Sequence, residues 1–292
     1  MSPNINLKTA NGWAILPSSL KHPDATPRFN LSFPSGFTTD QGAIHLIVNE
    51  SDNGYEPPTR NLIERVLRRG DLFVDVGAHW GFFTMQAATH PAGDIEVVSF
   101  EPDLMNAVIL TENVVKNKLS GVVTVVCAAC GSEQDLAELM TNSSMGHSIR
   151  GAGLPVQTGA KSKWVPIVTL DGALARLQKD AARRVIVKID AEGLETEIIA
   201  GAKSLLGGGH VALIVWECGR AYAEGRGRRA MIDMVAALSA HGFRHFQVPP
   251  DGAQIGADAK PIEFDAATGQ LGNIFSVGPR LLQDPDFDCA MA

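Results

Sequence analysis

Residues Asp71-Leu-Phe-Val-Asp-Val-Gly-Ala-His-Trp-Gly81 join an apolar run to an acidic residue and a turn with two glycines. The run from Leu72 to Val76 is too short and too β-branched for a helix, so it predicts a buried strand. Gly77 and Gly81 bracket a turn into the helix-like segment 82–88, and glycine lets the backbone approach a ligand without a Cβ in the way. The stretch therefore predicts a turn that binds a nucleotide cofactor, with an ordinary strand-to-helix turn as the alternative.

The turn does not have the form that binds a dinucleotide. That fingerprint is G-x-G-x-x-G after the strand, and His79 stands where its second glycine would approach the pyrophosphate. The stretch instead offers a carboxylate at the strand end, Asp75, and no site for a bulky anion. These features suit a cofactor that carries an amino acid and a cationic centre, as S-adenosylmethionine does.

A second acidic residue supports this interpretation. Residues 95–100 form another strand-like run that ends at Glu101-Pro102, and proline ends the hydrogen-bonded ladder of a strand. An acid at the end of the second strand of a βαβ unit can accept hydrogen bonds from both ribose hydroxyls of an adenosine. A surface glutamate at a strand end is the alternative, but it would not explain the spacing from the glycine turn.

Composition favours one large α/β unit. The chain has 292 residues and is 45% hydrophobic, which is enough for a single sizeable core, so we expect an N-terminal extension or cap over 1–55 and one domain over 56–292. The net charge of −7 argues against nucleic acid as a partner, because phosphate binding needs a basic face. No apolar run approaches the roughly 20 residues that span a bilayer. The first residues lack an export signal, so we expect no membrane contact and a cytoplasmic protein.

Strands and helices alternate from Leu72 onward, which predicts a doubly wound α/β fold with a mostly parallel sheet. After the first two strands, further strands are expected at 122–127, 165–170, 185–190, 211–217, 243–248 and 273–277, and helices at 104–118, 171–180, 195–206 and 230–241. The polar stretch 141–159 is expected to be a loop or an active-site flap. In the N-terminal extension, 11–16 and 45–48 look like strands, and a helix is expected from Pro57 to Arg69.

Several motifs in a fixed order resemble the FkbM-type methyltransferases, a class I group that depends on S-adenosylmethionine. The motifs are Asp75-Val-Gly-Ala-His-Trp-Gly81, Glu101-Pro102 with Asn113 and Asn117, Thr169-Leu-Asp171, Lys188-Ile-Asp-Ala-Glu-Gly-Leu-Glu195 with Gly201, and Asn273-Ile-Phe. The resemblance covers about Tyr55 to Val277 and departs at His79, where the family usually has asparagine. It implies a seven-stranded, Rossmann-like sheet with one antiparallel strand. It also implies methyl transfer, usually to oxygen on a sugar, polyketide or other small molecule.

In folds of this kind the ligand lies at the carboxyl ends of the strands, so cofactor contacts can be assigned to residues there. The expected contacts are Asp75, Gly77, His79 and Gly81 for the methionine part, Glu101 and Pro102 for the ribose, and Asp190. Ala128 and Ala129 follow the third strand and would either lie near the adenine or form a plain small-residue turn. The resemblance adds Glu56 and Ser144 as cofactor contacts.

Three carboxylates are expected on the substrate side of the cleft. Asp190 and Glu192 follow an apolar strand at the sheet centre, and Glu217 ends the neighbouring strand. Acids at buried strand ends are unfavourable unless they are paired or used, so we expect a catalytic role for them, with Lys188 as a structural partner. An alcohol loses a proton as it attacks, and Asp190, Glu192 or His147 could take it, whereas a carboxylate acceptor needs no base. Holding the reactants close and aligned can supply on the order of 7–11 kcal/mol without any base.

Metal and thiol chemistry are the weaker alternatives for this chain. The three carboxylates are ligands of a type that Mg²⁺ accepts, but the sequence shows no dedicated cage, so we expect no metal and acids that accept hydrogen bonds from substrate hydroxyls. Cys127-Ala-Ala-Cys130 has redox spacing but lacks the usual helix start.

The function that accounts for most of these features is S-adenosylmethionine-dependent O-methylation of a small hydroxylated or carboxylated metabolite. One alternative is a nicotinamide-dependent oxidoreductase, which the missing central glycine disfavours. Another is a non-catalytic chain that keeps the cofactor fold for assembly or ligand sensing. The expected partner is a small-molecule acceptor, and the N-terminal segment could cap the cleft or form the contact of a homodimer.

Overall fold

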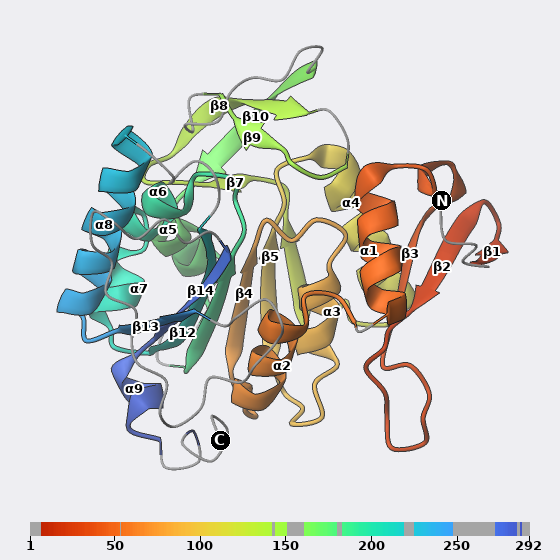
Figure 1. Cartoon of the computed structure of the whole chain (residues 1–292), viewed down its shortest axis with the longest axis horizontal. Coiled ribbons are helices and arrows are strands. Elements are labelled where there is room, and N and C mark those ends of the chain that lie inside the picture. The colour runs from red at the N-terminus through yellow and green to blue at the C-terminus, as the bar shows by residue number, and fades with distance from the viewer. Residues whose placement is uncertain are drawn as a thin grey trace.

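A seven-stranded sheet lies at the centre of the computed structural model, in the order β13-β14-β12-β11-β4-β5-β6 (Figure 1). The strands are β4 (Leu72–Val76), β5 (Glu96–Phe100), β6 (Val123–Val126), β11 (Val185–Ile189), β12 (Val211–Cys218), β13 (Arg244–Gln247) and β14 (Gly272–Val277). Within the sheet, β14 runs antiparallel to both of its neighbours and the other pairs are parallel. The sheet expected from the sequence, with one antiparallel strand, is confirmed. The structure describes residues 7–52, 54–141, 144–150, 161–179, 183–218, 225–247, 272–284 and 287.

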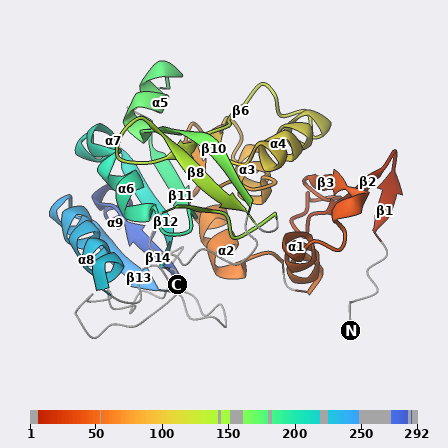
Figure 2. The ribbon, with the colours of Figure 1, turned by 90° about the horizontal axis from the view of Figure 1, so that it is seen from above.

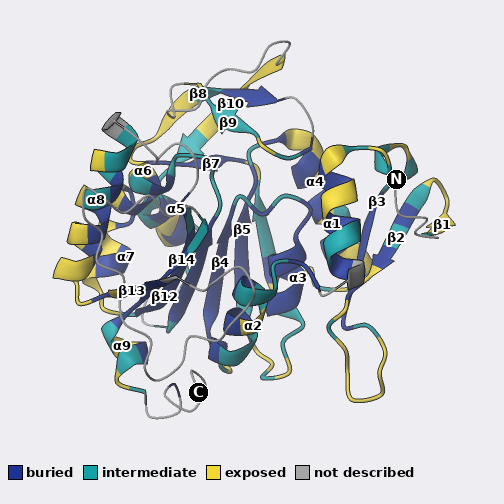
Figure 3. Cartoon of the chain, in the orientation of Figure 1, coloured by how far each residue is buried: buried dark blue, intermediate teal, exposed yellow. Residues whose placement is uncertain are grey.

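Helices cover both faces of this sheet (Figure 2). One face packs against α2 (Pro57–Val66), α3 (Phe82–Ala88), α4 (Leu104–Lys116) and α9 (Pro279–Leu282), and the other against α5 (Leu170–Arg176), α6 (Glu195–Ala200), α7 (Lys203–Gly207) and α8 (Gly225–Ala240). Successive side chains of a strand point to opposite faces, so Phe73 belongs to the first core and Leu72 and Val74 to the second. The central strands are therefore buried on both sides, as their apolar sequences predict (Figure 3).

Two smaller sheets complete the fold. A four-stranded sheet, in the order β7-β10-β8-β9, lies beyond one end of the central strands at the top of Figure 1. Its strands are β7 (Ala129–Cys130), β8 (Asp135–Thr141), β9 (Ser148–Ile149) and β10 (Lys161–Val168). The N-terminal extension forms an antiparallel sheet of β1 (Lys8–Ala10), β2 (Trp13–Pro17) and β3 (Asn30–Pro34), followed by the 3-10 turn η1 (Ser35–Phe37) and the helix α1 (Gln41–Asp52).

Polar side chains of α4 bind the N-terminal extension. Asn113 accepts a hydrogen bond from the Ser32 backbone N–H at 2.7 Å and donates one to the Trp80 carbonyl at 2.9 Å. Asn117 pairs with both backbone groups of Asn30, at 2.9 and 2.8 Å. The two asparagines that belong to the family motifs therefore join β3 to the helix after Glu101.

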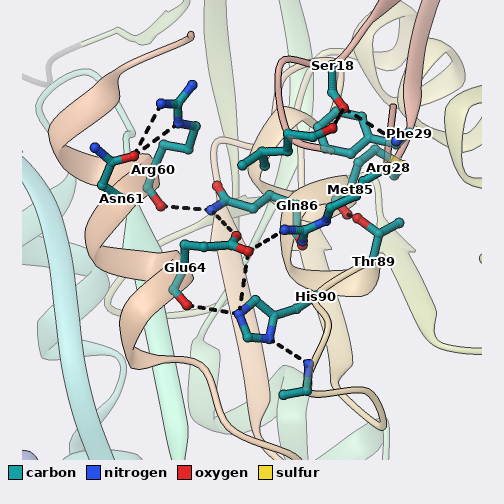
Figure 4. A network of polar contacts seen from close by, with 12 residues as sticks. Ser18, Arg28, Phe29, Arg60, Asn61, Glu64, Met85, Gln86, Thr89 and His90 are labelled. Carbon is teal, nitrogen blue, oxygen red and sulfur yellow. Dashed lines mark hydrogen bonds and ion pairs between the residues drawn. The ribbon is translucent and has the colours of Figure 1, made fainter. Parts of the chain in front are cut away.

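A buried arginine makes a second connection (Figure 4). The Arg28 side chain is 2% exposed, forms an ion pair with Glu64 of α2, and donates to the Gln86 carbonyl of α3 at 2.8 Å. Gln86 in turn donates to Glu64 at 3.1 Å, and the His90 ring contacts the Glu64 carbonyl at 2.9 Å. This cluster lies between the extension and the two helices, so the charge of Arg28 is paired where water is excluded.

The expectation of a strand at 45–48 is wrong, because these residues lie inside α1. Ala43, Leu46 and Ile47 are buried on one side of the helix, and the Asp40 side chain accepts from the N–H groups of Gly42 and Ala43 at its start. A short run of β-branched residues favours a strand locally, but burial at helical spacing decides the structure here.

The helix expected at 195–206 is divided into α6 and α7. Gly201 lies at the break, and a Cβ at this position would lie 2.1 Å from the Gly131 carbonyl oxygen. The strand β8 was not expected, and the expected loop at 141–159 contains the short strand β9, while 142–143 and 151–160 lie outside the described residues. The other expected elements are present with small shifts of their ends. Within the described part of the chain, none of the helices is long and apolar enough to cross a membrane.

Candidate active site

A cleft of about 950 Å³, partly open to solvent, lies at the carboxyl ends of β4, β5 and β11. One wall consists of these strand ends, with Gly77, His79, Glu101, Pro102 and Asp190. Ala128 and Ala129, after β6, also line it, as do residues 144–147, which precede β9, and Ile149 of β9. This volume includes space that is open to solvent.

The turn after β4 depends on its glycines. Gly77 has φ +76°, and a Cβ there would lie 1.9 Å from the Asp190 carbonyl oxygen, so no side chain fits between the ends of β4 and β11. Gly81 has φ +91° and precedes the first residue of α3. The sequence predicted that glycine here lets the backbone approach a ligand. At Gly77 the close approach is between the ends of β4 and β11, and it brings Asp190 next to the turn.

Glu101 lies at the end of β5 as predicted, and is 4% exposed. Its carboxylate accepts from the His79 N–H at 2.8 Å and from the Asp103 N–H at 3.0 Å, with one bond to each oxygen. Burial raises the pKa of Glu101 to about 7, although these two hydrogen bonds act in the opposite direction. Since each carboxylate oxygen has two acceptor positions, the residue can still accept from a ligand in the cleft.

His79 occupies a backbone conformation that is uncommon for a residue with a side chain, with φ +51°. Its ring stacks on Trp80, with 4.6 Å between the centroids. Burial, and then the nearby His147, lower the pKa of His79 to about 3, so the ring is neutral at physiological pH. Its Nε2 is buried in the cleft wall without a hydrogen-bond partner among the described residues.

Asp75 lies behind the turn and is not among the residues that line the cleft. It is 1% exposed, and its Oδ2 accepts from the Thr84 hydroxyl of α3 at 2.7 Å, while its Oδ1 has no partner among the described residues. Burial raises the pKa of Asp75, and the ammonium of Lys188 on the adjacent strand opposes this shift. This hydrogen bond joins the end of β4 to α3.

Asp190, Glu192 and Glu217 converge as predicted, and one oxygen of each lies within 4.8 Å of the others. Asp190 and Glu192 line the cleft, and Glu217 lies next to them at the end of β12. Burial, and then the neighbouring carboxylates of Asp190 and Glu192, raise the pKa of Glu217 to about 8. Glu217 therefore carries a proton at neutral pH.

Lys188 is the cation of this acidic group. Its ammonium lies 3.2 Å from Asp190 Oδ2, and the side chain is 6% exposed. Burial alone would lower the pKa of Lys188, but the carboxylates of Asp190, Asp75 and Glu56 hold it above its ordinary value. The structural partner expected for these acids is confirmed.

The turn after β11 is built to present Asp190 and Glu192. Glu192 has φ +49° and Gly193 φ +103°, both in the left-handed region. The buried carboxylate of Glu195 accepts from the N–H groups of Ala191 at 2.9 Å and Gly193 at 3.1 Å, which holds this conformation. Such a strained backbone persists where the surroundings fix it, and it is common at functional sites.

Glu56 joins the acidic group from the N-terminal side. It has φ +41° at the start of α2, accepts from the Asn273 amide of β14 at 3.1 Å, and lies close enough to Lys188 and Asp190 for their charges to act on it. Burial raises the pKa of Glu56, while Lys188 lowers it. Its neighbour Tyr55 lines the cleft, whereas Glu56 is not among the lining residues.

Ser144 and His147 both line the cleft. Ser144 is 5% exposed and bound to Asp40 of the N-terminal extension, through its backbone N–H at 3.1 Å and through its hydroxyl. His147 lies close enough to His79 in the glycine turn, and to Asp103 at the start of α4, to lower the pKa of both.

Sequence reasoning missed Asn106 and Asp40. Asn106 is 3% exposed, lines the cleft, accepts from the Trp80 indole at 2.9 Å and donates to the Ser144 carbonyl at 2.9 Å. Its position one turn into α4, on the side of Glu101, could have indicated it. Asp40 could have been found from its place before a helix, but the helix itself was not expected.

The seven-stranded sheet with one antiparallel strand, and a cleft at the strand ends with an acid after the second strand, are features of the class I methyltransferase fold. The chain belongs to the FkbM methyltransferase family, which depends on S-adenosylmethionine, since the model of the FkbM methyltransferase domain matches residues 75–245. No curated protein matches the chain in sequence.

Solved structures with a similar fold include a methyltransferase FkbM from Methylobacillus flagellatus, with 13% identity, a TM-score of 0.48, and coverage of 81% of this chain and 54% of that one. The chain therefore spans about half the length of that protein. An O-methyltransferase from Bacillus cereus in complex with SAH has 13% identity, a TM-score of 0.44, and coverage of 80% and 88%. A precorrin-6y C5,15-methyltransferase from Geobacter metallireducens has 12% identity, a TM-score of 0.41, and coverage of 77% and 89%.

Proposed function

We propose that this chain transfers the methyl group of S-adenosylmethionine to an oxygen atom of a small hydroxylated or carboxylated acceptor. The observation that carries the proposal is the convergence of Asp190, Glu192 and Glu217 beside the glycine turn. Asp190 and Glu192 line the cleft and Glu217 adjoins them, which supports a role in contacting the hydroxyl groups of an acceptor. They can accept hydrogen bonds from such an acceptor and take up its proton.

The cleft fits the cofactor on its own chemistry. Glu101 retains acceptor positions for ribose hydroxyls, and the unpartnered His79 Nε2 offers a polar contact in the same wall. Gly77 and Pro102 line the cleft and would shape the surface around the methionine and ribose, whereas Gly81 and Asp75 do not line it and would act through the shape of the turn. Ala128 and Ala129 would leave room for the adenine. When bound, S-adenosylmethionine supplies the electrophilic methyl group of its sulfonium centre.

On the acceptor side we assign Glu217 as the base that receives the proton of an alcohol. Asp190 is held by Lys188, whose ammonium lies 3.2 Å from its Oδ2. Glu217, whose pKa is about 8, holds a proton less tightly than an alcohol and more tightly than an ordinary carboxyl group. Glu192 and His147 would contact the acceptor, and Glu56 would orient Lys188. If the acceptor is a carboxylate, these groups position it and no proton moves.

The first test is calorimetric titration of the cofactor-free protein with S-adenosylhomocysteine and S-adenosylmethionine. We expect micromolar binding, and about 10- to 100-fold weaker binding for Glu101→Gln, because the loss of a charge-assisted acceptor costs roughly 1.5–3 kcal/mol. Glu133→Gln, at an exposed glutamate, is the matched control and should bind like the wild type. Equal affinities for wild type and Glu101→Gln would remove Glu101 from the cofactor site.

The second test identifies the atom that is methylated. The protein is incubated with methyl-labelled S-adenosylmethionine and panels of polyols, hydroxy acids and amines, and the products are analysed by mass spectrometry and NMR. We expect methyl ethers or esters, and we expect Glu217→Gln to reduce formation of ethers more than of esters. Methylation of nitrogen or carbon, with none of oxygen, would overturn the proposal.

A further inference from the structure

Residues 144–149, here called the Ser144 segment, form the wall of the cleft that faces the strand ends. Ser144, Met145, Gly146, His147 and Ile149 of this segment all line the cleft. The segment follows β8, far in sequence from the glycine turn, so the width of the cleft depends on what holds it in place.

Asp40 of the N-terminal extension holds the segment directly. Its Oδ2 accepts from the Ser144 N–H at 3.1 Å, and its Oδ1 accepts from the Ser144 hydroxyl. The same Oδ1 accepts from the N–H groups of Gly42 at 2.9 Å and Ala43 at 3.3 Å at the start of α1. One carboxylate therefore joins the N-terminus of α1 to the Ser144 segment.

The first turn of α1 also packs against the segment without any space between them. A Cβ at Gly42 would lie 2.3 Å from Ser144 Oγ and 2.5 Å from Met145 Cγ, so a side chain here would displace both. From the other side, Asn106 donates to the Ser144 carbonyl at 2.9 Å and accepts from the indole of Trp80 in the glycine turn at 2.9 Å. Ser144 is thus held between the N-terminal extension and the glycine turn.

We propose that Asp40 is a positioning residue: with Gly42 it fixes the Ser144 segment against the cleft, and so the N-terminal extension sets how fast the cofactor dissociates. The retention of the cofactor rests on the proposed function, whereas the positioning of the segment does not. The extension contributes to the cleft in its own right, because Leu46 of α1 and Tyr55 after it also line it. The methyltransferase domain alone would have a cleft with one wall unsupported.

Asp40→Asn separates this role from capping of α1. Asparagine caps helices as well as aspartate does, so the Oδ1 contacts with α1 are retained. The new amide places a donor opposite the Ser144 N–H, which removes that hydrogen bond. Asp24→Asn is the matched control, because Asp24 accepts from the backbone and hydroxyl of Thr26 in the same way, at 3.0 and 2.7 Å, but on an exposed turn.

The first measurement is amide hydrogen exchange of the full-length, cofactor-free protein. We expect residues 144–150 to exchange about tenfold faster or more in Asp40→Asn than in wild type, because an opening that no longer breaks a charge-assisted bond is easier. Peptides from β2 and β3 should exchange at the wild-type rate, and Asp24→Asn should match wild type throughout. Unchanged exchange at 144–150, or equal acceleration across the whole extension, would overturn the positioning role.

The second measurement is the dissociation rate of S-adenosylhomocysteine, by displacement in a stopped-flow instrument. We expect an increase of about tenfold for Asp40→Asn, with a change in association rate of less than about threefold, since most affinity changes appear in dissociation. Gly42→Ala should act in the same direction, and Gly36→Ala, whose Cβ meets nothing within 4 Å, should not. Ser144→Ala removes the hydroxyl contact with Asp40 Oδ1, which Asp40→Asn retains, so the double variant should release the ligand faster than either single variant.

The two measurements distinguish failure of the proposed function from failure of the inference about Asp40. If wild-type protein binds neither cofactor form, the proposed function and the retention claim both fail, while hydrogen exchange still decides whether Asp40 positions the segment. If wild type binds but Asp40→Asn dissociates at the wild-type rate, the retention claim alone is wrong.

Discussion

At the scale of single residues, burial and neighbouring charge set the protonation of the acids in the cleft. Glu101 and Glu217 have pKa values raised to about 7 and about 8, in both cases chiefly because burial disfavours the charged carboxylate. Glu217 also faces the negative charges of Asp190 and Glu192. A carboxyl group whose pKa lies near the working pH is suited to exchange protons with a substrate.

The pH dependence of methyl transfer follows from this assignment. With an alcohol acceptor, we expect kcat/KM to rise with pH and to level off above about 8, because Glu217 acts as a base only after it has lost its own proton. Glu217→Gln should lower kcat roughly 100- to 10,000-fold and abolish the rise of kcat/KM with pH. Initial rates between about pH 5.5 and 9.5 test it, with Glu133→Gln as control. If kcat/KM of Glu217→Gln still rises with pH, another group accepts the proton.

The departure from the family at His79 has a limited effect. Asparagine adopts the left-handed conformation more readily than histidine, and the His79 ring is neutral in any case, because its pKa is about 3. We expect His79→Asn to bind S-adenosylhomocysteine within about threefold of wild type and to lose little stability, since stacking on Trp80 contributes only about 0.5–1.5 kcal/mol. Calorimetry and thermal unfolding measure both. A loss of binding greater than about thirtyfold would show that the Nε2 contact dominates at this position.

At the scale of elements, Gly201 divides α6 from α7 because the Gly131 backbone approaches it. Gly201→Ala should destabilise the fold by about 1–3 kcal/mol, as overpacking against a rigid backbone does. The matched control is Gly207→Ala in α7, where a Cβ meets nothing within 4 Å and alanine should be neutral or slightly stabilising. Urea unfolding gives both free energies. Equal stability of the two variants would mean that the two segments can separate without loss.

The elements that the sequence predicted well are those whose burial is uniform. β4, β5, β11 and β12 are short apolar runs between turn residues, and such runs are typical of strands buried on both faces. The failures depend on distant contacts. Residues 45–48 are helical because α1 buries one side against the extension and the domain, and the break at Gly201 depends on Gly131, which no local pattern reveals.

The residues of the candidate site also fall into two groups, those that the local sequence predicted and those that depend on distant contacts. Glu101, Asp190 and Glu192 were predicted to share a cleft because the carboxyl ends of parallel strands meet at one edge of a sheet, and they do line one cleft. Asp40 and Asn106 were missed because they act through Ser144, which lies 104 and 38 positions away from them in the chain. Asp75 was expected at the ligand, but the side chain points behind the turn to Thr84.

At the scale of the whole molecule, the N-terminal extension and the methyltransferase domain share one apolar core. Phe33 of β3 stacks on Trp80 of the glycine turn, with 4.8 Å between the ring centroids, and Phe29 packs against Phe82 of α3 at 5.5 Å. The sequence suggested a boundary near residue 55 because the βα pattern begins after it. Periodicity cannot show that the extension fills the space beside α3 and α4, since that packing joins residues far apart in the chain.

We therefore propose that residues 7–55 are an integral layer of the enzyme, and Arg28 tests this. Arg28→Met leaves Glu64 without its buried ion pair and the Gln86 carbonyl without its donor, so we expect a loss of roughly 2–4 kcal/mol of unfolding free energy. The control is Arg69→Met, because the pair between Arg69 and Asp94 spans 3.8 Å with side chains 79% and 64% exposed, and such pairs contribute about 0–1 kcal/mol.

The readout is urea unfolding followed by circular dichroism, combined with hydrogen exchange at the same urea concentrations. An integral layer predicts that peptides from β2 and β3 lose protection together with those from β11 and β12, at one midpoint that Arg28→Met lowers for all of them. A separate cap predicts that Arg28→Met exposes only the extension and leaves the midpoint of the central sheet unchanged. Because Asp40 lies in the same layer, the single-midpoint outcome would also mean that cofactor binding stabilises the extension, since whatever binds the folded state favours every part that folds with it.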